Sequence, residues 1–213
     1  MVVPAIKICG ISTAEALDAA IAARADYAGF VFFPPSPRHV SPGDAAALGA
    51  HAKGRIQRVG LFVDADDAAI VAGVRAASLD IVQLHGEETP QRVAQIRAQI
   101  GLPVWKAIPV AAARDVLNAE VYVDAADLIL FDAKTPKGTL PGGMGLTFDW
   151  PLLAAWQNRA PWGLAGGLNP ENVTAAGRLT HAPLVDTSSG VESAPGIKDA
   201  AKITAFCAAA RAA

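Results

Sequence analysis

The sequence lacks the features that mark several large classes of protein. Its only two cysteines, Cys9 and Cys207, lie near opposite ends of the 213 residues, so they predict no disulfide framework and favour a reducing compartment. Hydrophobic runs are interrupted by charged residues before they reach membrane-spanning length, and the first residues show no basic leader or cleavage site. We therefore expect a cytoplasmic protein that does not contact a membrane.

Strong charge of either sign is also missing. The net charge is −2, and no stripe of basic residues suits a phosphate backbone, so nucleic acid is not an expected partner. No histidine or cysteine pair has the spacing of metal ligands, so no metal site is expected. A hydrophobic fraction of 52% excludes a disordered chain, and no linker divides the sequence, so we expect one domain over residues 1–213.

The sequence does contain a regular alternation of short apolar runs and alanine-rich segments. The runs predict eight strands: Val3–Cys9, Asp26–Phe32, Gln57–Val63, Asp80–Leu84, Pro103–Ile108, Asp127–Phe131, Trp162–Ala165 and Pro183–Asp186. The segments predict helices near Thr13–Arg24, Pro42–Ala52, Asp66–Ala77, Pro90–Gln99, Ala112–Ala119, Trp150–Asn158, Pro170–Gly177 and Ile197–Ala212. Eight such units favour a single (β/α)₈ barrel of parallel strands, with an open doubly wound sheet as the alternative.

Two local patterns predict where helices begin. Ser12 and Glu15 have the spacing of a capping box, and Thr89 is followed by Pro90 at the first helical position.

A barrel would place its active site where the strands end and the following loops begin. The polar residues at those ends are the first candidates, before any family is considered: Cys9, Arg38, Asp64, His85, Asp132 and Asp186.

Glycine-rich turns follow the last two predicted strands. One contains Gly166 and Gly167, and the other contains Ser188, Ser189 and Gly190. Glycine lets the backbone approach an anion closely, and the loops after strands seven and eight of this fold often bind phosphate. Tight structural turns are the alternative, but two such loops together favour a phosphate ester as ligand.

Cys9 closes the first predicted strand. Because side chains alternate, Lys7 and Cys9 share one face, while Ile6 and Ile8 suit the face covered by helices. A buried lysine needs a partner, and Asp186 ends the strand that would close the barrel, so we expect a Lys7–Asp186 ion pair. That cation would also favour the Cys9 thiolate. Cys207, on the last helix, is expected to be buried and inert.

Asp132 ends the sixth predicted strand on the same face as Leu128 and Leu130, which directs its carboxyl group inward. A thiol and a carboxyl group across one barrel mouth form a plausible acid–base pair. Arg38 offers a forked donor suited to a carboxylate, although a surface arginine is an equal alternative. His85 is either a satisfied polar residue or part of the site.

Short motifs along nearly the whole chain resemble the phosphoribosylanthranilate isomerase family of tryptophan biosynthesis. They are Lys7–Gly10, Gly29–Phe32 with Ser36–Arg38, Gln83–Gly86, Gly142–Gly145 (which includes Gly143) with Phe148–Trp150, Leu164–Leu168 and Asp186–Glu192. Each glycine turn is weak alone, but the ordered set is specific. Met144 and Thr187 depart from the family pattern, in which a small polar residue and a valine are more usual.

The resemblance implies an Amadori rearrangement of N-(5'-phosphoribosyl)anthranilate. Asp132 would be the general acid and Cys9 the general base, and Arg38 would bind the anthranilate carboxylate. Gly166, Gly167, Ser188, Ser189 and Gly190 would bind the phosphate; Lys7, His85, Gly143 and Asp186 complete the candidate pocket.

The resemblance implies neither a metal nor an organic cofactor, and its members occur as monomers or homodimers. Two rivals remain. One is the histidine-pathway Amadori isomerase, expected to carry an aspartate where this chain has Cys9 and to hold two phosphates. The other is a silent barrel that binds a phosphate ligand without catalysis.

Overall fold

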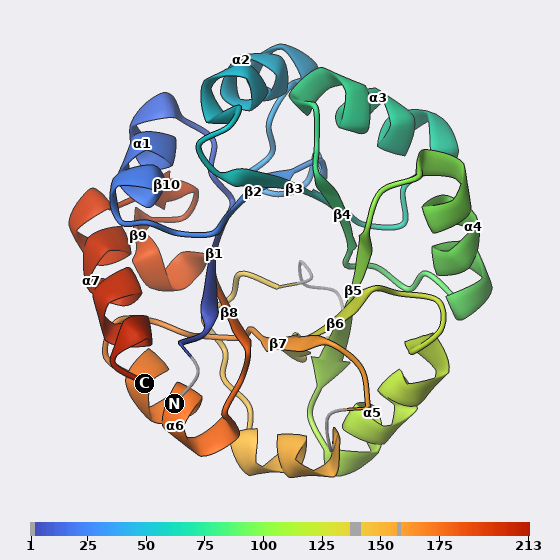
Figure 1. The fold of residues 1–213 in the computed structure, drawn as a ribbon, viewed down its shortest axis with the longest axis vertical. Helices are drawn as coiled ribbons and strands as arrows, with labels where there is room; N and C mark the ends of the chain where they lie inside the picture. Colours follow the sequence, from blue (N-terminus) through green and yellow to red (C-terminus); the bar gives the residue numbers. More distant parts are fainter. Residues whose placement is uncertain (1–2, 137–141, 157–158) are drawn as a thin grey trace.

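The computed structural model describes residues 3–136, 142–156 and 159–213, and its strands form one closed ring (Figure 1). All neighbouring strands of the ring are parallel and in chain order: β1 (Ala5–Cys9), β2 (Tyr27–Val31), β3 (Gln57–Phe62), β4 (Ile81–Leu84), β5 (Val104–Val110), β6 (Leu128–Ala133), β7 (Trp162–Leu164) and β8 (Leu184–Thr187). The predicted (β/α)₈ barrel is confirmed, and the open sheet is excluded.

Helices surround this ring on its outside (Figure 1). They are α1 (Ala14–Ala22), α2 (Pro42–Ala52), α3 (Asp67–Ala77), α4 (Pro90–Ile100), α5 (Ala113–Asn118), α6 (Val173–Thr180) and α7 (Ala200–Arg211), with the 3₁₀ helices η1 (Ala119–Tyr122), η2 (Trp150–Trp156) and η3 (Ser189–Val191). A short hairpin of β9 (Glu192–Ala194) and β10 (Ile197–Lys198) precedes α7.

The ring closes between β1 and β8, where Lys7 is in register with Asp186. Along β1 the side chains alternate as predicted. Ile6 and Ile8 belong to the main cluster beneath the helices, whereas Cys9 packs with Val31 and Leu61 in a separate cluster. This alternation brings polar side chains from successive strands into the interior of the barrel.

Several helix ends differ from the prediction because nearby side chains accept hydrogen bonds from backbone amides. Thr13, and not Ser12, caps α1, and its Oγ1 accepts a hydrogen bond from the Ala16 amide. The predicted helix from Pro170 begins only at Val173, because the Asn169 side chain accepts from the Asn172 amide and holds a turn before it. The Thr89 cap with Pro90 is confirmed.

Two predicted helices were partly wrong. The segment from Trp150 is a 3₁₀ helix as far as Trp156, and residues 157–158 lie outside the described part of the chain. The last helix begins at Ala200, because Ile197 and Lys198 pair with β9 in the hairpin. Among the described residues, no helix combines the length and the apolar character needed to cross a bilayer.

Candidate active site

A pocket opens at the carboxyl ends of the barrel strands, as the fold predicts. Most of the predicted site residues contribute to its wall, which includes Cys9, Arg38, His85, Asp132, Gly142, Gly143, Gly166, Gly167, Asp186, Ser188 and Ser189. The structure therefore brings together side chains that are far apart in the sequence. Lys7 and Gly190 are not among the lining residues.

Lys7 lies below the pocket wall and is completely buried, and its Nζ is 2.9 Å from Oδ2 of Asp186. The expected ion pair is confirmed. Gly29 on β2 makes room for this group, since a Cβ there would lie 2.9 Å from the Cys9 sulfur. The other oxygen of Asp186, Oδ1, is buried and has no hydrogen-bond partner among the described residues, although Asp186 lines the pocket.

Burial raises the pKa of the Cys9 thiol, and the neighbouring Asp186 carboxylate adds to this shift. Lys7 opposes both effects but does not cancel them. The expectation that Lys7 favours the thiolate is thus right in direction, while the thiol remains the preferred form overall. For Lys7, burial alone would lower the pKa, but Asp186 and Cys9 outweigh it and keep the ammonium charged.

Asp132 is buried at the end of β6, and its Oδ2 lies 3.0 Å from Nε2 of His85, which follows β4. Gln83 lies 3.2 Å from the other ring nitrogen of His85. His85 is therefore a direct partner of Asp132, a role that the sequence left open. Glycine at position 142 leaves space here, because a Cβ would come within 3.0 Å of both side chains.

Arg38 is also buried, but its guanidinium already binds a carboxylate of the protein. Nε and Nη2 donate to the two carboxylate oxygens of Glu192 at 2.7 and 2.8 Å, and Nη2 donates to the carbonyl oxygen of Gly143 at 3.1 Å. Nη1 has no hydrogen-bond partner in the described part of the chain. Only this side of the guanidinium is left for a ligand.

The two glycine-rich loops also line the pocket. Gly166 and Gly167 have φ angles of 87° and 61°, and a Cβ on Gly166 would lie 2.5 Å from the Ala133 amide nitrogen. Between described residues, no hydrogen bond uses the amide N–H of Gly166, Gly167 or Ser188. These donors are free to bind an anion.

Gly190 has a different position. A Cβ at this residue would lie only 1.9 Å from the carbonyl oxygen of Leu168, so glycine lets the loop after β8 pack against the loop after β7. Thr187 strengthens the same contact, because its Oγ1 donates to the Leu168 carbonyl at 2.6 Å. Within the segment 132–147, the residues that line the pocket are Asp132, Ala133, Thr135 and 142–146, and residues 137–141 lie outside the described chain.

Three residues that contact the predicted site residues had no role assigned from the sequence: Gln83, Glu192 and Lys198. Glu192 appeared only as the end of a motif, and Lys198 appeared inside a predicted helix. A usable signal existed for Glu192, because a buried arginine at a strand end needs an acidic partner and Glu192 follows the last glycine turn.

A closed parallel barrel with a polar pocket at the carboxyl ends of its strands defines an enzyme of the (β/α)₈ class. The sequence model of the family described as N-(5'-phosphoribosyl)anthranilate (PRA) isomerase matches residues 6–209. The chain belongs to this family, and the predicted family and isomerase class are confirmed.

Relatives and solved structures agree with this assignment. The N-(5'-phosphoribosyl)anthranilate isomerase of Paracoccus denitrificans is 56% identical over 208 residues, which are 97% of each chain. The phosphoribosyl anthranilate isomerase of Thermotoga maritima superposes with a TM-score of 0.88 at 38% identity, covering 99% of this chain and 100% of that one. A further isomerase structure, in complex with reduced 1-(o-carboxyphenylamino)-1-deoxyribulose 5-phosphate, has a TM-score of 0.86 at 35% identity, covering 99% and 100%.

Proposed function

We propose that this chain, acting as one catalytic domain, converts N-(5'-phosphoribosyl)anthranilate to 1-(o-carboxyphenylamino)-1-deoxyribulose 5-phosphate. One observation carries the proposal: Cys9 and Asp132 line a single pocket that also contains Arg38 and the free amides of two glycine-rich loops. An acid, a base and two separate anion-binding groups are what an Amadori rearrangement of this substrate requires.

Asp132 is the general acid of the proposed reaction. It donates its proton to the ribose ring oxygen, the bond from that oxygen to C1 breaks, and the nitrogen lone pair forms the C1=N bond of a Schiff base. His85, 3.0 Å from Asp132, holds the carboxyl group in place. Because Asp132 is buried at the end of a rigid strand, it is positioned before the substrate arrives.

Cys9 is the general base. Its thiolate removes the C2 proton of the Schiff base, and the electron pair moves toward nitrogen to give an enolamine, which tautomerises to the ketone. Burial raises the pKa of this thiol, so the charge of Lys7 is needed to make the thiolate accessible. The substrate nitrogen accepts the electron pair, so the proposal includes neither a metal nor an organic cofactor.

The substrate is held at its two ends. The unpaired side of Arg38 binds the anthranilate carboxylate, and the free amides of Gly166, Gly167 and Ser188, together with Ser189, bind the phosphate. Gly190 acts indirectly in this arrangement by allowing the two loops to pack. Asp186 supplies its unpaired oxygen as an acceptor for a substrate hydroxyl group.

In this proposal the protein works in the cytoplasm, as a monomer or a homodimer. A Thermotoga maritima relative whose structure is known was described as dimeric and also yielded monomers, so both states are compatible with this fold. Light scattering of the purified protein distinguishes the two states.

The decay of phosphoribosylanthranilate fluorescence in the presence of purified protein tests the proposal directly. We expect first-order decay at a rate proportional to protein concentration. Binding of the reduced product analogue without any decay would overturn the proposal and support the silent barrel. Absence of both decay and binding would overturn the substrate assignment itself.

A further inference from the structure

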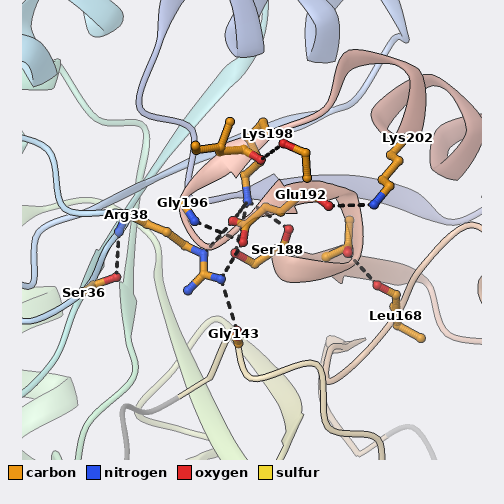
Figure 2. A network of polar contacts seen from close by, with 12 residues as sticks. Ser36, Arg38, Gly143, Leu168, Ser188, Glu192, Gly196, Lys198 and Lys202 are labelled. Atoms are coloured by element: carbon orange, nitrogen blue, oxygen red, sulfur yellow. Dashed lines mark hydrogen bonds and ion pairs between the residues drawn. The ribbon is translucent and has the colours of Figure 1, made fainter.

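Glu192 is shared by two buried cations at the edge of the pocket (Figure 2). Its Oε1 accepts hydrogen bonds from Nε of Arg38 and from Nζ of Lys198, both at 2.7 Å, and its Oε2 accepts from Nη2 of Arg38 at 2.8 Å. The side chains of Glu192 and Lys198 are only 4% and 1% exposed. Such a carboxylate fixes the geometry of both partners, because breaking either contact would leave a charge buried without its partner.

Lys198 connects this carboxylate to the loop after β8. Its Nζ donates to the carbonyl oxygen of Ser188 at 2.9 Å and to Oγ of Ser188 at 3.3 Å, in addition to Glu192. All three hydrogens of the ammonium group are therefore used. Ser188 lines the pocket, and its amide makes no backbone hydrogen bond to another described residue.

The hairpin of β9 and β10 brings these groups together. Lys198 and Glu192 are paired across the hairpin, and the Gly196 amide at its turn donates to Oε2 of Glu192 at 3.2 Å. Gly196 has a φ angle of 83°, and a Cβ there would lie 2.6 Å from the carbonyl oxygen of Pro37. The turn thus packs directly against the residue before Arg38.

A second close approach brings Arg38 next to Ser188. A Cβ on Gly10, which follows Cys9, would lie 2.5 Å from Cδ of Arg38 and 3.2 Å from Oγ of Ser188. The aliphatic part of Arg38 and the Ser188 side chain therefore both lie close to Gly10, the residue after the proposed base.

The charges in this network do not cancel. Arg38 and Lys198 are two basic groups and Glu192 is one acidic group, so basic groups outnumber acidic ones at the pocket wall, although burial lowers the pKa of the Lys198 ammonium. Burial would raise the pKa of Glu192, but the hydrogen bonds and charges of Arg38 and Lys198 outweigh it and lower the pKa. Glu192 is thus ionised at neutral pH, and the remaining positive charge favours an anionic ligand.

We propose that Glu192 is a positioning residue that sets both anion-binding groups of the site at once. It orients Arg38 directly and Ser188 through Lys198, so the distance between the carboxylate and phosphate sites is fixed by one buried side chain. This inference rests on the proposed function for the identity of the two anions. A purely structural ion pair would instead affect folding and leave the two binding sites independent.

The variant Glu192→Gln keeps the shape of the side chain and removes its charge. We expect the Kd of the reduced product analogue to rise by about 10- to 100-fold, because Arg38 loses its charged partner. The Kd of ribulose 5-phosphate, which has no carboxylate, should rise by about 3- to 10-fold through Lys198 and Ser188. KM should rise with the first ligand, while kcat changes by less than about 5-fold.

Arg38→Ala and Lys198→Gln separate the two arms of the network: the contact of Glu192 with Arg38, and the contact of Glu192 with Ser188 through Lys198. We expect Arg38→Ala to weaken binding of the analogue strongly and to leave ribulose 5-phosphate binding nearly unchanged. Lys198→Gln should weaken the binding of ribulose 5-phosphate most. If Glu192→Gln does not fold, unchanged binding of ribulose 5-phosphate by Lys198→Gln would overturn the inference.

Asp80→Asn is the matched control. Asp80 accepts from Nε and Nη2 of Arg58, both at 2.8 Å, and neither residue lines the pocket. We expect this variant to lower the Tm without changing either Kd.

Isothermal titration of both ligands into each variant decides the matter. The inference is overturned if Glu192→Gln weakens binding only of the ligand that carries a carboxylate, or if it lowers the Tm and leaves both Kd values at the wild-type level.

The proposed function fails if the wild type itself neither binds the analogue nor turns over substrate. The coupling of the two arms is then tested by measuring the binding of ribulose 5-phosphate and of anthranilate separately. There too, a response of only one of these two ligands to Glu192→Gln would overturn the inference.

Discussion

The Nε2 atom of His85 lies 3.0 Å from Oδ2 of Asp132, and Gln83 lies against the other ring nitrogen. When the Gln83 amide donates to Nδ1, the ring proton is on Nε2, which then donates to Oδ2 of the carboxyl group, and the proton of the acid is on Oδ1. His85→Ala should lower kcat by about 10- to 100-fold because the acid is no longer held in place. KM should change by less than about 3-fold, since His85 is not among the proposed anion-binding groups.

His181→Asn is the control for this prediction, because His181 is exposed at the end of α6 and does not line the pocket. Steady-state kinetics of both variants give the two parameters. A rise in KM with unchanged kcat for His85→Ala would show that the histidine binds substrate and does not position the acid.

Lys7 has two effects that can be measured separately. Lys7→Met leaves the Asp186 carboxylate buried without its partner, and should lower the free energy of unfolding by about 3–5 kcal/mol. It also removes the cation that lowers the pKa of Cys9. Because the base must be the thiolate, the rise of kcat/KM with pH should move to higher pH.

Denaturant titration and pH–rate profiles test both parts of this prediction. The double variant Lys7→Met/Asp186→Leu should regain most of the lost stability, because no unpaired charge remains. An unshifted pH profile in Lys7→Met would contradict the role given to the cation.

Thr187 connects the two glycine-rich loops through its 2.6 Å hydrogen bond to the Leu168 carbonyl. Thr187→Val removes the donor and leaves a buried carbonyl oxygen unpaired, which should cost about 1–2 kcal/mol of stability and raise KM by about 2- to 5-fold. Thr174→Val deletes a similar bond, to Ala209 at 2.7 Å between α6 and α7. It should lower the Tm similarly and leave KM unchanged; equal KM changes in both variants would contradict a role for Thr187 in the loops.

Cys207 should make the fold sensitive to alkaline pH. Burial raises the pKa of this thiol from 9.0 to about 11, so the folded state holds the proton more tightly than the unfolded state. The resulting stability is present in full below pH 9 and is lost as the pH rises through 11, amounting to about 2 kcal/mol. Cys207→Ala should have a flatter dependence of unfolding free energy on pH between these values. If the unfolding free energy depends on pH with the same slope in the wild type and in Cys207→Ala, this role of Cys207 is contradicted.

Much of the barrel could be predicted because it depends on short-range pattern. Near-continuous apolar runs gave all eight strands of the ring to within a few residues, and the alternation along β1 placed Lys7 inside. Closure of the ring then made Asp186 its expected partner. The capping role expected of Ser12 and the helix start at Pro170 were wrong because neighbouring side chains formed the hydrogen bonds with the backbone.

The contacts around the proposed anion sites could not be predicted in the same way. Glu192 is separated from Arg38 by 154 positions, and nothing in the local sequence of either residue identifies the other. Lys198 lay inside a predicted helix, whereas the structure pairs it with Glu192 across the hairpin of β9 and β10. Long-range contacts of this kind need the three-dimensional structure.

Single-turnover kinetics of Cys9→Ala and Asp132→Asn, combined with titration of the reduced product analogue, test the central claim most directly. Each variant should lose about 10²- to 10⁴-fold in the rate of the chemical step, the range expected for a general base or acid. Each should bind the analogue within about 3-fold of the wild type, because the groups that hold its two anions are intact. Turnover near the wild-type rate in either variant would contradict the role assigned to that residue.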